Sequence, residues 1–156
     1  RTVSSSFMVS CDNAHAVHPN HPEKSDQVNR VYMNRGIVIK ESANQKYTSD
    51  GASKAILRAI LDNAGVKYQF FANRSDMLGG GTLGNISNAH FSLNTVDIGL
   101  AQLAMHSSWE TAGSRDVDAM AASGNPSPKA VFMRKACNVL RGCVSKGRGG
   151  ERVGIV

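Results

Sequence analysis

The chain has 156 residues, of which 41% are hydrophobic, so it is long enough for one domain with a real core. No apolar run approaches the roughly 20 residues that a membrane helix needs, and no leader-like segment opens the sequence. We therefore expect neither a membrane protein nor a secreted one.

The net charge of +6 is confined to the end of the chain. Residues 1–122 carry 11 basic and 11 acidic side chains, so the whole excess lies in residues 123–156. A breaker-rich segment, Ser-Gly-Asn-Pro-Ser-Pro at 123–128, separates the two parts. We expect a domain over 1–122 and a basic, glycine-rich, poorly ordered tail over 123–156. Such a charge run is typical of a solvated end, so a nucleic-acid partner is not expected.

The chain has three cysteines, Cys11, Cys137 and Cys143. Their odd number and uneven spacing argue against a disulfide framework and favour a reducing compartment, so we expect a cytoplasmic protein. Cys137 and Cys143 are also spaced more widely than the usual zinc-ribbon pair.

The first half of the domain alternates between strand-like and helix-like segments. An apolar run at 7–9 predicts a short strand, and a β-branched run at 37–39 predicts a second strand that ends at Lys40. Asp50 is a suitable cap for the helical pattern that follows it. Gly65 stands where a helix end favours a left-handed residue.

The second half continues the alternation. Segment 68–72 predicts a strand, a triple glycine at 79–81 opens a helix over about 82–91, and 96–99 predicts a buried strand. A last helix is expected from a cap at Ser107 or Ser108 through Glu110. This order predicts an α/β fold, a parallel or mixed sheet with helices packed on it.

Two segments carry residues suited to a metal-dependent hydrolase. Ser-Cys-Asp-Asn-Ala-His-Ala-Val-His-Pro-Asn at 10–20 places Asp12, His15 and His18 within seven positions. Gln-Leu-Ala-Met-His-Ser at 102–107 offers His106. Carboxylate oxygen and imidazole nitrogen are ligands for zinc or manganese. Taken singly, each side chain is also explained as a cap or as a satisfied polar group.

Residues of both segments follow strand-like runs, as do Lys40 and the triple glycine. Functional loops gather at the carboxyl ends of strands, so we expect all of them on one rim. The glycines are either a turn needing positive φ or a backbone site for a substrate carboxylate or oxyanion. Lys40 read alone is a solvated lysine at a strand end.

The sequence resembles the aspartyl aminopeptidase family of dinuclear zinc exopeptidases. The resemblance covers about residues 5–118 and is carried by these runs: 10–20, Gly-Ile-Val-Ile-Lys at 36–40, Asn-Gln-Lys-Tyr at 44–47, Asn-Arg-Ser-Asp-Met at 73–77, Gly-Gly-Thr-Leu-Gly-Asn-Ile at 80–86 and Asp-Ile-Gly-Leu-Ala-Gln-Leu-Ala-Met-His-Ser at 97–107. It implies a three-layer sheet with helices on both faces, as part of a zinc-exopeptidase-like catalytic domain.

The resemblance also implies roles for particular residues. Asp12 and His106 each bind one of two zinc ions, one of which exchanges for manganese or cobalt. His18 lies near the scissile carbonyl as the catalytic histidine, with His15 in support. Lys40 contacts the acidic side chain of the substrate, and the glycine loop lines the substrate pocket through Gly80, Gly81 and Thr82.

The sequence departs from the family pattern in important places. The family site also uses an upstream histidine, a bridging aspartate and two adjacent glutamates, but the four glutamates here, Glu23, Glu41, Glu110 and Glu151, are not adjacent. The family's inserted lid domain, which carries oligomer contacts, is not in this sequence either. We therefore expect the C-terminal part of a longer enzyme, which needs its N-terminal half and forms a homo-oligomer when complete. After about residue 122 the resemblance fails.

The sequence is compatible with three functions. The first is part of an aminopeptidase that removes N-terminal Asp or Glu from peptides, inactive without the rest of the site. The second is a non-catalytic interaction or assembly module that keeps the fold. The third is a nucleic-acid binder acting through the basic tail. Retention of Asp12 and His106 favours the first function over the second, and the location of the excess charge argues against the third.

Overall fold

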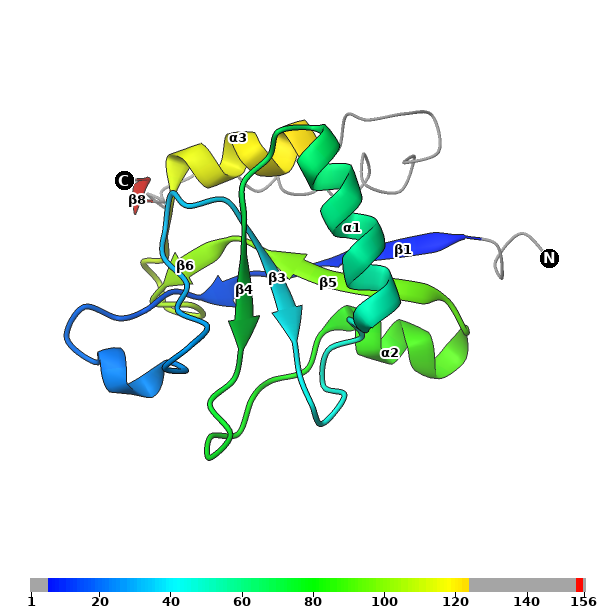
Figure 1. The fold of residues 1–156 in the computed structure, drawn as a ribbon. Helices are drawn as coiled ribbons and strands as arrows, with labels where there is room; N and C mark the ends of the chain where they lie inside the picture. Colours follow the sequence, from blue (N-terminus) through cyan, green and yellow to red (C-terminus); the bar gives the residue numbers. More distant parts are fainter. Residues whose placement is uncertain (1–5, 124–153, 156) are drawn as a thin grey trace.

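The computed structural model describes residues 6–123 and 154–155, and Figure 1 shows their arrangement. The elements in chain order are β1 (Phe7–Cys11), β2 (Ala14–His15), a 3₁₀ turn (Pro22–Lys24), β3 (Ile37–Glu41), α1 (Gly51–Asn63), β4 (Tyr68–Ala72), α2 (Leu83–His90), β5 (Asn94–Gly99), β6 (Ala101–Leu103), β7 (Thr111–Ala112), α3 (Ser114–Ser123) and β8 (Gly154–Ile155). No helix among the described residues is long and apolar enough to cross a membrane.

Four strands form the main sheet in the order β1-β5-β3-β4. β1 runs parallel to β5 and β3 runs parallel to β4, whereas β3 and β5 are antiparallel. The sheet is therefore mixed, as the alternation of elements predicts. It brings β1 beside β5, although the two strands are far apart in the sequence.

The pairing of β1 and β5 continues beyond the main sheet. Backbone hydrogen bonds from Asp12 to Ile98, Ala14 to Leu100 and Ala16 to Gln102 lead into the parallel pair β2 and β6. A second sheet then has the order β2-β6-β7-β8. The carboxyl ends of β1 and β5 consequently lie side by side, which places the two motif segments next to each other.

Close approach at this point requires a glycine. A Cβ atom on Gly99 would lie 1.9 Å from the carbonyl oxygen of Asp12, which no side chain tolerates. Gly99 also pairs with Val38 across the antiparallel β3–β5 ladder. Glycine here therefore allows three segments to meet, and one of them carries Asp12.

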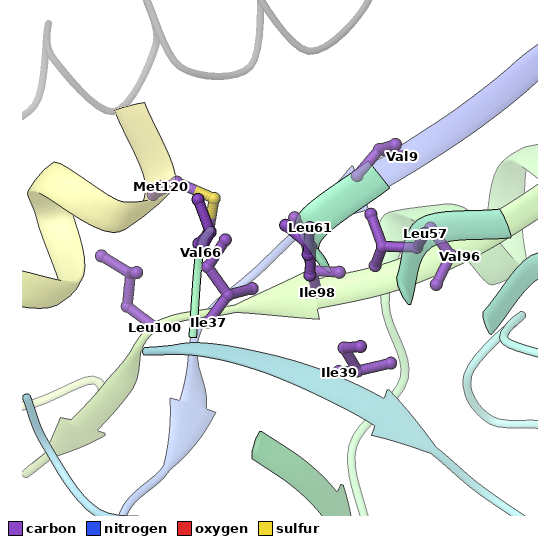
Figure 2. Close-up of a cluster of buried hydrophobic side chains, with 10 residues drawn as sticks. All are labelled: Val9, Ile37, Ile39, Leu57, Leu61, Val66, Val96, Ile98, Leu100 and Met120. Atoms are coloured by element: carbon purple, nitrogen blue, oxygen red, sulfur yellow. The ribbon is translucent and has the colours of Figure 1, made fainter. Parts of the chain in front are cut away.

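The helices cover both faces of the main sheet. Val9, Val96 and Ile98 face the side occupied by α1 and α3, as the core around Leu57, Leu61 and Met120 shows (Figure 2). On the opposite face, the Gly84 N–H of α2 donates a buried 3.1 Å hydrogen bond to Ser10 Oγ. The expected three-layer arrangement is confirmed.

Alternation along β3 divides its side chains between the two faces. Ile37 and Ile39 join the main core, whereas Val38 belongs to a second cluster with Ala14, Val31 and Ala101. Lys40 follows Val38 on that second face and is buried. Because side chains alternate between the two faces of a strand, the ammonium group of Lys40 lies on the face opposite the main core.

The local signals around α1 are confirmed. Asp50 and Ser53 form a reciprocal capping box at its start. Gly65 follows its end with φ +65°, the left-handed conformation expected there. Strand β4 has the predicted bounds. β1, β3 and β5 are longer than the predicted cores, and Lys40 lies inside β3 instead of ending it.

One predicted helix is wrong. No helix is present from Ser107 or Ser108 through Glu110, and the last helix, α3, begins at Ser114. Ser107 Oγ accepts a hydrogen bond from Trp109 N, as a cap would, but Glu110 accepts from the backbone of His106 instead of completing a capping box. Residues 124–153 of the predicted tail lie outside the described residues, and Gly154–Ile155 pair with β7.

Candidate metal and substrate site

One cavity of about 380 Å³ collects most of the predicted site residues. It lies where the segments after β1, β4 and β6 meet the end of β3. The predicted residues thus come together, but not at the shared carboxyl edge that the sequence suggested, because β3 runs antiparallel to β5. The predicted residues in its wall are Asp12, His15, His18, Lys40, Gly80, Gly81 and His106. Four separate segments of the sequence therefore contribute these predicted residues to one cavity.

Lys40 is the buried cation of this cavity. Its Nζ lies 3.6 Å from Asp12 Oδ2 and donates a 3.2 Å hydrogen bond to the Asn13 carbonyl. The same Nζ lies 5.0 Å from the centre of the Tyr47 ring, within cation–π range. Burial lowers the pKa of Lys40, while the nearby Asp12 and Asp97 carboxylates oppose that shift. The side chain is held where an anionic group in the cavity could reach it.

Asp97 lies behind the cavity wall and was not assigned a role from the sequence. It is fully buried on β5, and its Oδ2 accepts hydrogen bonds from Thr48 N at 2.6 Å and Thr48 Oγ1 at 2.7 Å. These bonds fasten the segment that carries Tyr47 to the main sheet. The available signal was a carboxylate between two apolar residues, Val96 and Ile98.

Tyr47 is a second wall residue without a predicted role, although its motif was recognised. Its ring is buried, and its hydroxyl accepts a 3.2 Å hydrogen bond from Asn73 Nδ2. Burial raises the pKa of the Tyr47 phenol, so the hydroxyl stays protonated at neutral pH. Tyr47 and Asn73 both line the cavity.

His106 lies on the loop between β6 and β7. The residue is exposed, and its φ of +67° is left-handed. Its backbone N–H donates a 2.6 Å hydrogen bond to Glu110 Oε1. His106 also lines the cavity, and its role as a metal ligand stays a prediction.

The two histidines of the first motif also line the cavity. The pKa of His15 is lowered by partial burial first, then by His106 and Lys40, and is raised by Asp12. These four side chains therefore share one electrostatic environment. His18 Nδ1 accepts a 3.2 Å hydrogen bond from Asn20 N, and its ring centre lies 5.4 Å from that of His21.

The residues of the predicted glycine loop do not all reach the cavity. Gly80 and Gly81 line the cavity, but Thr82 is buried outside its lining as the residue before α2. Within the described part of the chain, Thr82 Oγ1 has no hydrogen-bond partner. Lys46 Nζ donates a 2.7 Å hydrogen bond to the Gly79 carbonyl, which fixes the entry to this loop.

Asp12 and His106 fit a zinc site as contributors. They offer the carboxylate oxygen and imidazole nitrogen that zinc takes, and both line the cavity. Residues 6–123 and 154–155 contain no cluster of three or more His, Cys, Asp or Glu side chains able to hold a metal ion. A catalytic zinc takes three protein ligands, so these residues alone do not complete one.

Comparison with known proteins identifies the family of the chain. The model of the family described as aminopeptidase I zinc metalloprotease (M18) matches residues 1–123. The chain belongs to the M18 aminopeptidase family. Membership confirms the resemblance seen in the sequence, and the family description names zinc as its metal.

Curated M18 relatives are much longer than this chain. A probable M18 family aminopeptidase 2 of Clostridium acetobutylicum is 52% identical over 116 residues, which are 74% of this chain and 27% of that protein. A protein of the same name from Clostridium novyi is 49% identical over the same coverage. The chain thus spans about a quarter of the length of the curated relatives it matches.

Solved M18 structures share the fold. In the Ape4–Nbr1 complex, the similar chain has a TM-score of 0.72 and 31% identity, covering 90% of this chain and 26% of that one. The S. cerevisiae mApe1 dodecamer has a TM-score of 0.59 and 28% identity, covering 67% and 22%. Aminopeptidase I of Clostridium acetobutylicum has a TM-score of 0.56 and 30% identity, covering 65% and 23%.

Proposed function

We propose that these residues form the C-terminal part of an M18 catalytic domain that removes N-terminal Asp or Glu from peptides. The observation that carries this proposal is the buried ammonium group of Lys40, which lines the same cavity as Asp12 and His106. A buried cation beside metal-ligating residues suits a substrate that brings a carboxylate side chain to the site.

The predicted residues have distinct roles in this site. Asp12 and His106 each contribute to one of two zinc ions, of which one exchanges for manganese or cobalt. When bound, zinc would polarise the scissile carbonyl and activate water. Lys40 pairs with the substrate carboxylate and His18 serves the scissile carbonyl. Gly80 and Gly81 shape the pocket, whereas Thr82 lies outside its lining, at the start of α2.

The complete activity requires partners outside these residues. The proposal assigns the remaining metal ligands and the general base to an N-terminal part, in line with the greater length of the relatives. It also assigns a homo-oligomer to the complete enzyme, since a similar yeast chain is a dodecamer. The cysteine usage supports a cytoplasmic location.

Lys40→Met in the complete enzyme tests the specificity. Removing one partner of a partly desolvated pair costs about 2–4 kcal/mol, so the wild-type preference for an acidic over an alanyl N-terminal residue should be roughly 30- to 1000-fold. The variant should lose that preference through kcat/KM on acidic peptides and retain its zinc content.

His18→Ala is the matched control on the same cavity wall. It should slow acidic and alanyl substrates alike, because His18 serves the peptide bond and not the side chain. An unchanged acidic preference in Lys40→Met would assign carboxylate recognition to other groups, such as the amides of Gly80 and Gly81. A complete enzyme without any zinc-dependent cleavage would favour the non-catalytic assembly module.

A further inference from the structure

The loop that carries His106 has an unusual backbone. Ala104 and His106 have φ values of +55° and +67°, and neither is glycine. Residues with a Cβ atom adopt the left-handed region rarely, and they keep it only where the surrounding structure holds them. Two such residues within three positions therefore require contacts that hold the loop backbone in this conformation.

Glu110 provides a restraint from across the loop. The Ser107 N–H donates a 3.0 Å hydrogen bond to the Ala104 carbonyl, which closes a tight turn. Within that turn, the His106 N–H donates a 2.6 Å hydrogen bond to Glu110 Oε1. The carboxylate of Glu110 therefore binds the backbone of His106 directly.

Glu110 is in turn well anchored. It directly precedes β7, whose Thr111 and Ala112 pair with Leu103 and Gln102 of β6. The loop is thus the tip of a hairpin, with His106 on one arm and Glu110 at the base of the other. The Glu110 side chain is half-buried and lies next to a paired strand, so its position is fixed relative to the loop tip.

We propose that Glu110 is the positioning residue for His106, holding its backbone left-handed so that the imidazole faces the cavity. The inference rests on the proposed function, in which His106 binds zinc. Glu110 does not touch the metal or the substrate in this proposal. Partners that orient a metal ligand typically change metal affinity by about 10- to 100-fold when they are removed.

Three variants of the complete enzyme separate a hydrogen-bonding role from a role of charge alone. Glu110→Gln keeps an acceptor oxygen at the same reach and removes the charge. Glu110→Asp keeps the charge and withdraws the oxygen by one methylene group. Glu110→Ala removes both. Zinc affinity is measured by competition with a chelator, and exchange of the His106 amide proton is measured in the metal-free protein.

Positioning by the hydrogen bond predicts one order of effects. Glu110→Gln should bind zinc within about fivefold of wild type, while Glu110→Asp and Glu110→Ala should lose about 10- to 100-fold. The His106 amide should exchange faster in the last two variants only. The opposite order, with Glu110→Asp near wild type and Glu110→Gln impaired, would overturn the proposal in favour of simple attraction between charges.

A control and a second readout keep the result interpretable. Glu23→Gln changes an exposed glutamate outside the cavity lining and should leave zinc affinity and His106 exchange unchanged. Unchanged His106 exchange in Glu110→Ala would refute the positioning role whatever the metal does. If instead exchange rises while His106→Ala keeps its full zinc content, the positioning holds and the metal assignment of His106 fails.

Discussion

Asp116 and Gly36, 80 residues apart in the sequence, are joined by a 2.7 Å hydrogen bond from the Gly36 N–H to Asp116 Oδ1. The other carboxylate oxygen accepts a 2.6 Å bond from Asn34 N. Because Asp116 lies on α3 and Gly36 immediately precedes β3, this buried carboxylate fixes the start of the strand that carries Lys40.

Asp116→Ala should therefore destabilise the fold. It leaves two backbone N–H groups without their carboxylate, at a cost of about 2–4 kcal/mol in the free energy of unfolding. Urea unfolding of the variant and of wild type measures the difference. Asp118→Ala, an exposed carboxylate on the same helix, should change stability by less than about 0.5 kcal/mol. Equal effects of the two changes would contradict this account.

Gly99→Ala should damage the site without altering a ligand. Its Cβ would lie 1.9 Å from the Asp12 carbonyl oxygen, so the chain at Asp12 must move. We expect a loss of roughly 1–3 kcal/mol or more in stability and a lower zinc content. Gly51→Ala is the control, since nothing lies within 4 Å of its Cβ and it begins α1. Denaturant unfolding and elemental analysis of the complete enzyme measure both effects.

Removal of either proposed zinc ligand should remove a metal ion. Asp12→Ala and His106→Ala in the complete enzyme should each lose about one metal equivalent, with activity lower by several orders of magnitude, because a two-metal site acts jointly. Elemental analysis gives the metal content and a peptide assay gives the rate. Full occupancy in both variants would mean that these residues have a structural role.

The 156 residues alone should not hydrolyse peptides. The four glutamates include no adjacent pair, and the described residues hold no cluster of three metal-ligating side chains. The proposed mechanism needs both a complete metal shell and a general base. Incubation of the zinc-loaded chain with Asp- or Glu-peptides should give no more product than a heat-treated control. Metal-dependent cleavage by these residues would exclude the division of the site between two parts of an enzyme.

His15 should report the electrostatics of the cavity in the metal-free protein. Its folded pKa lies below the ordinary value of 6.5, chiefly through burial and then through His106 and Lys40. The unfolded chain thus binds a proton more readily, so the contribution of His15 to stability is intact above pH 6.5 and is lost as the pH falls through the lower folded pKa.

An NMR titration of the His15 ring measures this shift. His106→Ala should raise the midpoint toward 6.5 by removing a side chain that lowers the pKa of His15, while Asp12→Ala should lower it further by removing the opposing carboxylate. A midpoint that neither substitution moves would show that the four side chains do not share one environment.

The sequence by itself determined the family, most of the local elements and the candidate residues that line the cavity. Asp50, Gly65 and the β-branched strands are local signals, because capping, left-handed φ and alternation depend on near neighbours. Asp12, Lys40 and His106 were found through motifs that stand at strand ends. That strand-end positions suggest one rim was an inference from a parallel sheet. In the mixed sheet β3 runs antiparallel to β5, so the approach of Lys40 to Asp12 is set by the register between these two strands.

The tertiary structure decided what depends on distant contacts. The predicted helix at Glu110 is replaced by a hairpin tip, because the carboxylate binds the His106 backbone across the loop. Buried Asp97, whose partner Thr48 lies 49 residues away, had no local signal beyond its apolar neighbours. Thr82 entered the predicted pocket by its motif, yet packing at the start of α2 buries it outside the cavity lining. Neighbours of this kind are set by strand order and close packing, which no short pattern in the sequence encodes.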